Sequence, residues 1–197
     1  MSNFRLRDPD CVLIHVPKTG GTSIRKGIWG SNYEGPAFGE IPTGWAALFK
    51  FAFTRHPLQR FVSAWRMFTE GARGDPQWKL PEDARPLSLE DFMDIVEDER
   101  IIYDGRRRSF EEKIRHHTIP QTHPFNCLHL ADHIARYEDY EREVRSICTR
   151  VGVPLDRVPH MHVTTPVHWS SILKGSLLER VKSYYREDLE ALGYAGA

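Results

Sequence analysis

The chain has 197 residues, 40% of them hydrophobic, and its 27 Lys and Arg residues are balanced by 27 Asp and Glu residues. A formal charge of zero excludes the overall positive field that nucleic-acid and anionic-membrane partners require, so we expect neither partner. The apolar fraction argues against disorder, and a chain of this length buries roughly 70% of its unfolded surface. We therefore expect a single domain over residues 1–197, with room for two lobes.

Charge and cysteine content narrow the expectation further. Residues 1–75 carry 10 Lys and Arg against 6 Asp and Glu, whereas residues 76–197 carry 17 against 21, which indicates an anionic ligand early in the chain or only differing solvated faces. Three scattered cysteines without a CxxC pair are typical of a reducing compartment. The first residues contain no apolar leader, and no stretch approaches the roughly 20 apolar residues of a membrane helix. We expect a soluble, cytoplasmic protein.

The first predicted element is a buried, parallel strand over residues 11–16, a short β-branched apolar run. The loop PKTGGT at 17–22 follows, and then a helix over 23–29 with apolar residues at helical spacing. Two glycines let the backbone approach an anion, and the first turn and dipole of a helix attract negative charge. Lys18 adds a point charge. Because this lysine precedes the glycines, the loop is not a Walker A loop, and a plain Gly-Gly turn is the alternative.

A second strand-to-helix element follows, with a strand over 49–54 and a helix over 57–68 that begins at a proline. The helix has one apolar stripe that we expect in the core, formed by Leu58, Phe61, Val62, Trp65 and Phe68. Arg55 stands at the strand end, where ligands of open parallel sheets bind, unless it pairs with a carboxylate. Arg60 and Ser63 lie three residues apart on another face and can contact a common group.

Together the two elements resemble a known family. The segment IHVPKTGGTSI at 14–24 closely resembles the 5′-phosphosulfate loop of sulfotransferases that use 3′-phosphoadenosine 5′-phosphosulfate (PAPS), and FTRHPLQRFVSAW at 53–65 resembles their 3′-phosphate motif. The best match is the carbohydrate-type branch, which includes the heparan sulfate 2-O-sulfotransferases and compact bacterial members. Weaker likeness extends over 88–92, 117–122, 136–139 and 185–194.

The resemblance implies an α/β, P-loop-like three-layer domain with a short parallel sheet and helices on both faces. PAPS is then the cofactor, without a metal. Its 5′-phosphosulfate would be held by the backbone of Lys18, Thr19, Gly20, Gly21, Thr22 and Ser23. Arg55 and Ser63 would hold the 3′-phosphate, because an arginine fork and a hydroxyl suit a dianion. We interpret the positive charge of Lys18, Arg55 and Arg60 as a local site for this nucleotide.

The resemblance also implies the chemistry, an in-line and loose transfer analogous to phosphoryl transfer. Lys18 would stabilise the charge that develops on the bridging oxygen, a role commonly worth ~3 kcal/mol. The acceptor hydroxyl needs a general base. We favour Glu40 over Glu34, because its spacing from Lys18 and its place before the second strand match the family, with a solvated loop residue as the alternative. His116 and His117 are the rival bases, or else they contact substrate or are structural.

The rest of the chain is predicted mostly as scaffold. Ser88 caps a helix over 89–96, residues 140–151 form a helix that ends at Gly152, and Ser176 with Glu179 forms a capping box for the last helix. The three arginines at 106–108 form a solvated face or contact an anionic acceptor. Residues 159–166 align with a family loop that approaches the nucleotide, which usually has Asn at the position of His162.

A zinc site and two other functions remain open. Cys127, His129 and His133 could bind zinc if they share a helix, with simple packing as the alternative. A P-loop nucleotide kinase requires a metal-binding acid at the strand end where Arg55 stands. A noncatalytic nucleotide-binding or interaction module would keep Arg55 and Ser63 but lack a working base. The sequence favours a PAPS-dependent sulfotransferase that acts on a hydroxyl of a carbohydrate or small molecule.

Overall fold

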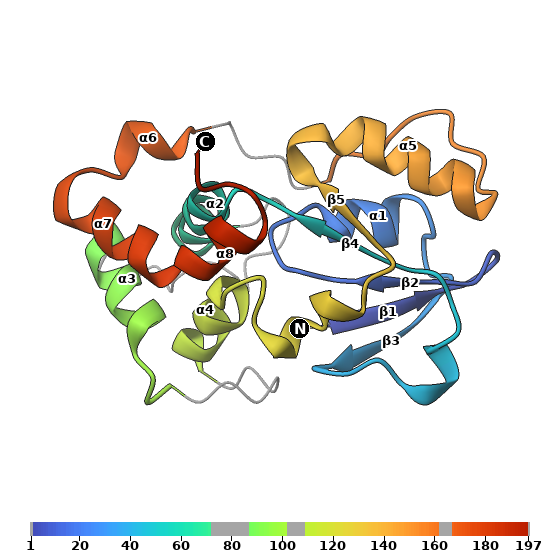
Figure 1. Ribbon diagram of the computed structural model, residues 1–197, viewed down its shortest axis with the longest axis horizontal. Helices are drawn as coiled ribbons and strands as arrows, with labels where there is room; N and C mark the ends of the chain where they lie inside the picture. Colours follow the sequence, from blue (N-terminus) through green and yellow to red (C-terminus); the bar gives the residue numbers. More distant parts are fainter. Residues whose placement is uncertain (1, 72–86, 102–108, 162–166, 197) are drawn as a thin grey trace. The chain divides into compact units, whose positions relative to one another are not determined.

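The structure, a computed structural model, describes residues 2–71, 87–101, 109–161 and 167–196. Figure 1 shows its helices and strands in chain order. The contacts within the chain define two compact units. The first, here called the sheet unit, comprises Met1–Arg55 and Gln121–Met161, and the second, the helical unit, comprises His56–Pro120 and His162–Ala197.

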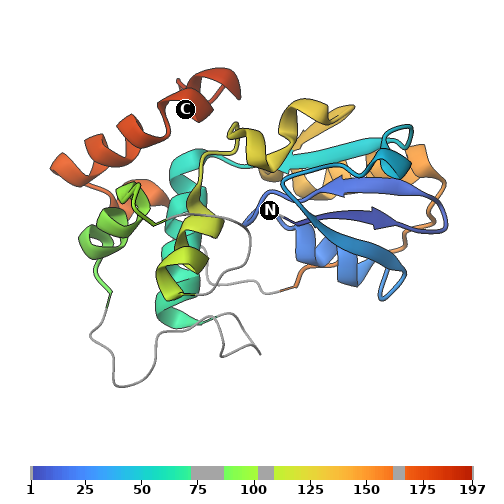
Figure 2. The same ribbon diagram turned by 90° about the horizontal axis from the view of Figure 1, so that it is seen from below.

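A five-stranded sheet forms the centre of the sheet unit, and its strands run side by side in Figure 2 in the order β3-β1-β2-β4-β5. The strands are β1 (Ser2–Leu6), β2 (Cys11–Ile14), β3 (Tyr33–Phe38), β4 (Lys50–Thr54) and β5 (His133–Arg136). β2, β4 and β5 are parallel, whereas β1 is antiparallel to β2 and to β3. The two strands that we predicted are confirmed as β2 and β4. The antiparallel strands β1 and β3 go beyond the prediction.

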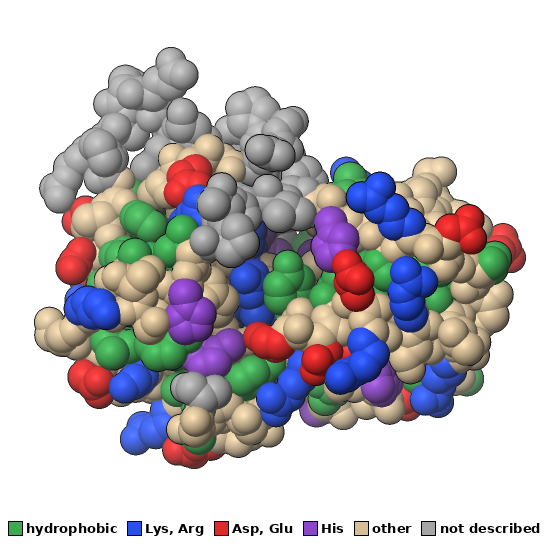
Figure 3. All heavy atoms as spheres, turned by 90° about the horizontal axis from the view of Figure 1, so that it is seen from above, with side chains coloured by type: hydrophobic (Ala, Val, Ile, Leu, Met, Phe, Trp, Pro, Cys, Tyr) green, Lys and Arg blue, Asp and Glu red, His purple; other side chains and the backbone are tan. Residues whose placement is uncertain are grey.

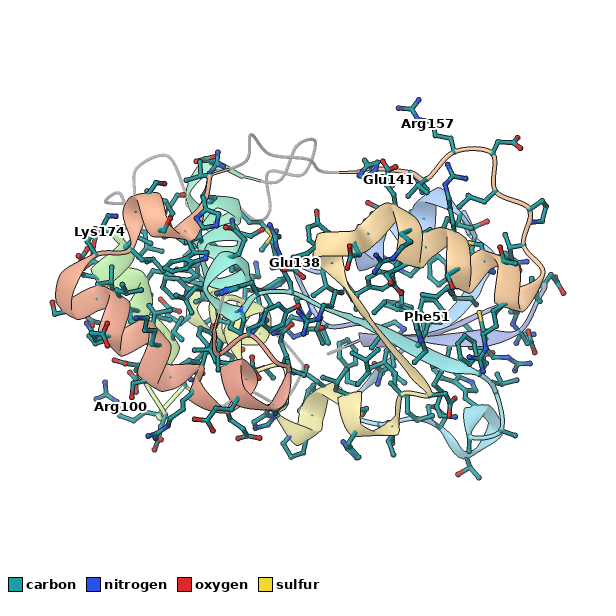
Figure 4. All side chains as sticks on the ribbon, turned by 45° about the horizontal axis from the view of Figure 1, so that its top comes forward. Phe51, Arg100, Glu138, Glu141, Arg157 and Lys174 are labelled. Atoms are coloured by element: carbon teal, nitrogen blue, oxygen red, sulfur yellow. The ribbon has the colours of Figure 1, made fainter. Side chains whose placement is uncertain are left out.

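One face of the sheet packs against helices α1 (Gly21–Gly27) and α5 (Tyr140–Val151). Side chains alternate between the two faces along a strand, so Leu13 and Phe51, which pair in register, contribute to the same cluster as Ile24 of α1. Figure 4 shows Phe51 between β4 and α5. As predicted, α5 ends at a glycine, whose left-handed backbone (φ 78°) closes the helix.

The opposite face of the sheet is also buried, with Val12, Ile14 and Ala52 fully shielded from solvent. Burial on both faces explains why the central parallel strands are apolar at consecutive positions. The predicted fold class, an α/β domain with a short parallel sheet flanked by helices, is confirmed. The connections contain short 3-10 helices at Thr43–Trp45, Pro124–Asn126, Leu128–Leu130 and Tyr137–Asp139.

The helical unit contains the remaining described helices. They are α2 (Pro57–Glu70), α3 (Leu89–Glu97), α4 (Phe110–Thr118), α6 (Trp169–Ile172), α7 (Gly175–Tyr184) and α8 (Arg186–Ala191). The predicted apolar stripe of α2 packs in the core of this unit, where Phe61 and Phe68 contact the ring of Phe92. Trp65 of the same stripe is half-buried, and its indole N–H donates to the Leu87 carbonyl.

Two predicted helix caps have different outcomes. Ser88 and Asp91 form the predicted capping box, because the Ser88 hydroxyl accepts from the Asp91 N–H and the Asp91 carboxylate accepts from the Ser88 N–H. The box at Ser176 is wrong. Helix α7 begins two residues earlier than this box requires, at Gly175 with Lys174 as its N-cap, so Ser176 lies inside the first turn, where its hydroxyl is not placed to cap.

Two features of the described surface and helices bear on partners. Figure 3 shows Lys and Arg side chains interspersed with Asp and Glu side chains on the face in view, which is consistent with the balanced composition. Among the residues that the structure describes, no helix combines the length and the apolar character that crossing a membrane requires.

Candidate active site

The loop between β2 and α1 has the tight turn that the sequence predicts for an anion-binding loop. Lys18 (φ 69°) and Gly20 (φ 85°) both adopt left-handed backbone, which costs a residue other than glycine on the order of 1 kcal/mol. Two hydrogen bonds hold this shape. The Thr19 hydroxyl donates to the Val16 carbonyl over 2.7 Å, and the Tyr140 hydroxyl donates to the Gly20 carbonyl over 3.3 Å.

Both loop glycines are required by close packing. A Cβ atom on Gly20 would lie 2.6 Å from a ring carbon of Tyr140, and one on Gly21 would lie 2.1 Å from the Cδ2 atom of His15. Such separations are far below van der Waals contact. The rings of Tyr140 and His15 therefore pack directly against the loop backbone and restrict its conformation.

Ser23 has structural bonds in this region. Its N–H donates to the Gly20 carbonyl over 3.0 Å, and its hydroxyl accepts from the Met161 N–H over 2.8 Å. The residue is buried, with 5% exposure. These bonds fix the start of α1, and the contact of Ser23 with a phosphosulfate stays a prediction.

Arg55 follows the last residue of β4 and lies beside the loop. Its Nη1 atom donates to the Lys18 carbonyl over 3.1 Å, and its guanidinium carbon lies 4.4 Å from the ring centre of Tyr137. The Gln121 carboxamide accepts from the Arg55 N–H and donates to the Arg55 carbonyl, each over 2.9 Å. Lys18 and Arg55 are therefore held together at the carboxyl ends of two neighbouring parallel strands, where α/β sheets bind ligands.

The charge of Arg55 affects the titration of Lys18. The pKa of Lys18 is lowered to about 8, first because burial disfavours the ammonium and second because the charge of Arg55 repels it. The side chain is half-buried rather than sealed from solvent. The negative charge of a bound anion would offset both effects, so this pair is suited to a ligand with several negative charges.

Glu40 is connected to the same end of the sheet through Asn3. The buried Asn3 side chain accepts from the His15 N–H over 3.3 Å and donates to the Glu40 carbonyl over 2.8 Å. The Glu40 backbone is thereby tied to the end of β2, just before Lys18, while the Glu40 residue is exposed. The other carboxylate candidate, Glu34, accepts from Arg7 over 2.6 Å in a surface ion pair.

His116 and His117 lie in the helical unit, on α4, and both are buried. The Nδ1 atom of His117 lies 2.7 Å from the Lys113 carbonyl. A carbonyl only accepts, so Nδ1 must carry the proton and Nε2 is the basic atom of the neutral ring. Its ring also packs edge-on against Phe68. The geometry is compatible with a base of fixed tautomer and with a structural residue.

Arg60 requires a correction. We expected it in the anion site, but in the helical unit it is fully buried and donates to the carbonyls of His117, Thr118 and Ile119 over 3.0, 3.2 and 2.5 Å. These carbonyls end helix α4 and have no partners within the helix. Arg60 therefore caps the negative end of a helix dipole. Ser63, three residues on, is half-buried on α2.

The chain was compared with protein families, curated proteins and solved structures. A sequence model of the sulfotransferase family matches residues 39–195. The chain belongs to the sulfotransferase family. This assignment implies a P-loop-like fold, sulfuryl transfer as the general activity and a hydroxyl-bearing acceptor. No curated protein and no solved structure matched the chain. The match includes Arg55, Ser63 and His117 but begins after the 17–22 loop, whose assignment rests on its motif and geometry.

Cys127, His129 and His133 of this sulfotransferase do not share a helix. They lie on 3-10 turns and at the start of β5, and the His133 ring pairs with Glu143 over 3.3 Å. Within the described ranges, no group of three His, Cys, Asp or Glu residues could hold a metal ion. Two further predictions, for the arginines at 106–108 and for His162, lie outside the described residues.

Sequence reasoning missed three residues that organise the site, namely Asn3, Gln121 and Tyr137. Gln121 belongs to the Pro-Gln segment and Tyr137 to the strand-end segment that resemble the family, so their positions carried a signal. Asn3 carried none, because its role depends on β1 pairing next to β2. Figure 4 shows Glu138, which follows Tyr137, at the end of β5, with Glu141 nearby at the start of α5.

Proposed function

We propose that this sulfotransferase transfers a sulfuryl group from PAPS to a hydroxyl of a carbohydrate or small-molecule acceptor. The observation that carries the proposal is the pairing of Lys18 with Arg55 through the Arg55 Nη1 bond to the Lys18 carbonyl. The 5′-phosphosulfate motif and the 3′-phosphate motif each contribute one of these cations. The carbohydrate-type resemblance supports the acceptor class.

The residues present fit a nucleotide with charged groups at both ends. The loop backbone turns sharply at Lys18 and Gly20, as close approach to a phosphate requires. Arg55 has a planar fork suited to a phosphate dianion, and its backbone is fixed by Gln121. In our proposal Lys18 to Ser23 hold the 5′ group, while Arg55 and Ser63 hold the 3′-phosphate. The bound donor would supply an activated sulfuryl group for in-line transfer.

Lys18 has the principal electrostatic role in this proposal. Its ammonium stabilises negative charge on the bridging oxygen, and one preorganised donor of this kind is commonly worth ~3 kcal/mol. Because its pKa is lowered to about 8, the side chain is mostly protonated at neutral pH and is costly to keep charged without an anion. Anion binding would therefore favour the charged form of Lys18.

Glu40 is the base that we favour, with His117 as the rival. Support for Glu40 comes from the Asn3 bridge, which ties its backbone to the strand that leads into the Lys18 loop. Support for His117 comes from the Nδ1 contact with the Lys113 carbonyl, which leaves Nε2 as the basic atom. Either group would remove the proton of the acceptor hydroxyl as its oxygen attacks.

The remaining proposals concern organisation and location. We propose that the two compact units form one sulfotransferase domain, because the family match spans residues of both. All three cysteines, Cys11, Cys127 and Cys148, are buried free thiols, and burial raises the pKa of each. Inert thiols suit a reducing compartment, and we propose the cytoplasm.

The test uses radiolabelled PAPS with a panel of hydroxylated acceptors, and binding of the product nucleotide 3′-phosphoadenosine 5′-phosphate (PAP) measured by thermal shift. Stabilisation by PAP together with labelled product supports the proposal. Absence of a PAP shift overturns it, and PAP binding without transfer to any acceptor indicates the noncatalytic module. Stabilisation by ATP-Mg beyond that by PAP would indicate the kinase.

The base is tested by two substitutions in the same assay. Glu40→Gln keeps the size of the side chain and removes its basicity, and the Asn3 bond to the Glu40 carbonyl is retained. We expect transfer to fall by about 10²-fold or more with PAP affinity unchanged. An active Glu40→Gln variant together with an inactive, folded His117→Ala variant assigns the base to His117 instead.

A further inference from the structure

We infer that Arg55 positions the Lys18 loop in addition to binding the 3′-phosphate, so that one side chain couples the two ends of the nucleotide site. The inference rests on the proposed function and concerns the affinity for ligands that lack a 3′-phosphate. If Arg55 only binds the 3′-phosphate, its removal does not change the affinity for nucleotides that lack this phosphate. If Arg55 also positions the loop, its removal lowers that affinity.

The first support is the bond between Arg55 and the loop. Arg55 Nη1 donates to the carbonyl of Lys18, and Lys18 is a non-glycine residue with left-handed backbone. That conformation is intrinsically disfavoured, so it persists only where surrounding contacts stabilise it. A charge-assisted bond at the carbonyl of the same residue is such a contact.

The second support is the way Arg55 itself is fixed. Both backbone groups of Arg55 bond to the fully buried Gln121 side chain, and its guanidinium stacks over Tyr137. The Tyr137 ring restricts the orientation of the guanidinium plane, and the Gln121 carboxamide fixes the backbone of Arg55. A restrained donor loses little entropy when it bonds, so it can transmit a fixed position to Lys18.

The third support is that Arg55 can bond to the Lys18 carbonyl and bind a 3′-phosphate at the same time. A guanidinium has five N–H donors in a planar fork, so a bond to one carbonyl and a bidentate bond to a phosphate can coexist. A 3′-phosphate that restrains the guanidinium further would stabilise the loop that receives the 5′ group. Coupling of this kind is reciprocal between the two sites.

The experiment compares dissociation constants of PAP and of 5′-AMP, which lacks the 3′-phosphate, for wild type, Arg55→Met and Ser63→Ala. We expect Arg55→Met to weaken the binding of PAP by about 100-fold and the binding of 5′-AMP by about fivefold to tenfold. Losses of this size correspond to one or two charge-assisted hydrogen bonds. Ser63→Ala, which removes only a proposed 3′-phosphate ligand, should weaken PAP by about tenfold and leave 5′-AMP within about twofold.

Two further measurements separate positioning from general destabilisation. Val144→Ala truncates a side chain of α5 in the core of the sheet unit and should lower the melting temperature without changing 5′-AMP affinity. Arg55→Met should also move the alkaline loss of 5′-AMP affinity to higher pH, because the positive charge that lowers the pKa of Lys18 is removed. Val144→Ala should leave that pH profile in place.

The outcomes distinguish the inference from the function on which it rests. A wild-type protein that binds PAP no more tightly than 5′-AMP overturns the proposed function and the inference with it. A wild type that prefers PAP, with an Arg55→Met variant that loses PAP affinity but binds 5′-AMP normally, overturns the inference alone. The inference is also overturned if Val144→Ala loses as much 5′-AMP affinity as Arg55→Met does.

Discussion

Arg55 and Arg60 stand five positions apart in the sequence, yet they serve different purposes. In the sheet unit, Arg55 lies at a strand end beside Lys18, and its repulsion contributes to the lowered pKa of that lysine. In the helical unit, Arg60 is buried, and its Nη1 and Nη2 atoms donate to the carbonyls that end α4. A cation that raises the electrostatic cost of its neighbour is suited to a ligand, whereas one surrounded by carbonyl acceptors stabilises the fold.

The largest expected effect is on catalysis, through Lys18. We predict that Lys18→Met lowers sulfuryl transfer by about 10²- to 10³-fold, because it removes the charge placed for the leaving oxygen. At pH 7 the same variant should be more stable than wild type, since a partly buried ammonium is removed. Transfer of label from PAPS and urea unfolding measure the two effects. Lys26→Met, on the exposed side of α1, is the control, and near-normal transfer by Lys18→Met contradicts the assignment.

The next effect is on stability, through Arg60. Arg60→Met removes the guanidinium that donates to the last carbonyls of α4, of which the Thr118 carbonyl keeps the Tyr185 hydroxyl as a donor, and we predict a loss of about 3 kcal/mol in the free energy of unfolding. PAP affinity of the folded fraction should be unchanged. Arg66→Met on the same helix removes a partly exposed i,i+4 pair with Glu70 and should cost about 0.5 kcal/mol. If Arg60→Met instead abolishes PAP binding in a stable protein, the contrast with Arg55 fails.

A third prediction concerns pH. The pKa of Lys18 is about 8 in the folded protein against 10.5 for an ordinary lysine, so between these values the unfolded chain binds more protons than the folded chain. The contribution of Lys18 to stability is therefore unfavourable below pH 8 and is relieved as the pH rises toward 10.5. Urea unfolding of wild type and Lys18→Met across this range isolates the effect. A stability difference between the two that does not narrow with rising pH contradicts the prediction.

The smallest effect compares two matched carboxamides, one in each unit. Gln121 bonds to both backbone groups of Arg55, and Gln59 bonds to the Val167 carbonyl and the Trp169 N–H. We predict that Gln121→Met and Gln59→Met each lower unfolding stability by about 1–2 kcal/mol. Only Gln121→Met should also lower the affinity for PAP, by several-fold, as measured by calorimetry. Equal weakening by both variants would show that the loss is structural.

Much of the fold and part of the site could be predicted from the sequence because their signals are local. The β2–loop–α1 and β4–α2 elements follow from apolar runs, two glycines and one proline. Arg60 could not be assigned, because its partners at 117–119 are brought to it only by the packing of α2 with α4. Asn3 was hidden for a similar reason, since its two bonds depend on an antiparallel strand without a distinctive pattern. At Ser176 the local pattern was present, but α7 begins two residues earlier than that pattern predicts.

The bonds between Arg55 and Gln121 also affect how well the segment between these two residues tolerates insertions. The chain passes out of the sheet unit after Arg55 and returns to it at Gln121, and those two residues, 66 positions apart, are joined by a pair of hydrogen bonds. The intervening segment is thus a loop closed at its base, independently of what it contains. Doubling the length of such a loop costs only about 0.6 kcal/mol in closure entropy. Insertions within this excursion therefore cost little in closure entropy while β4 and β5 keep their pairing.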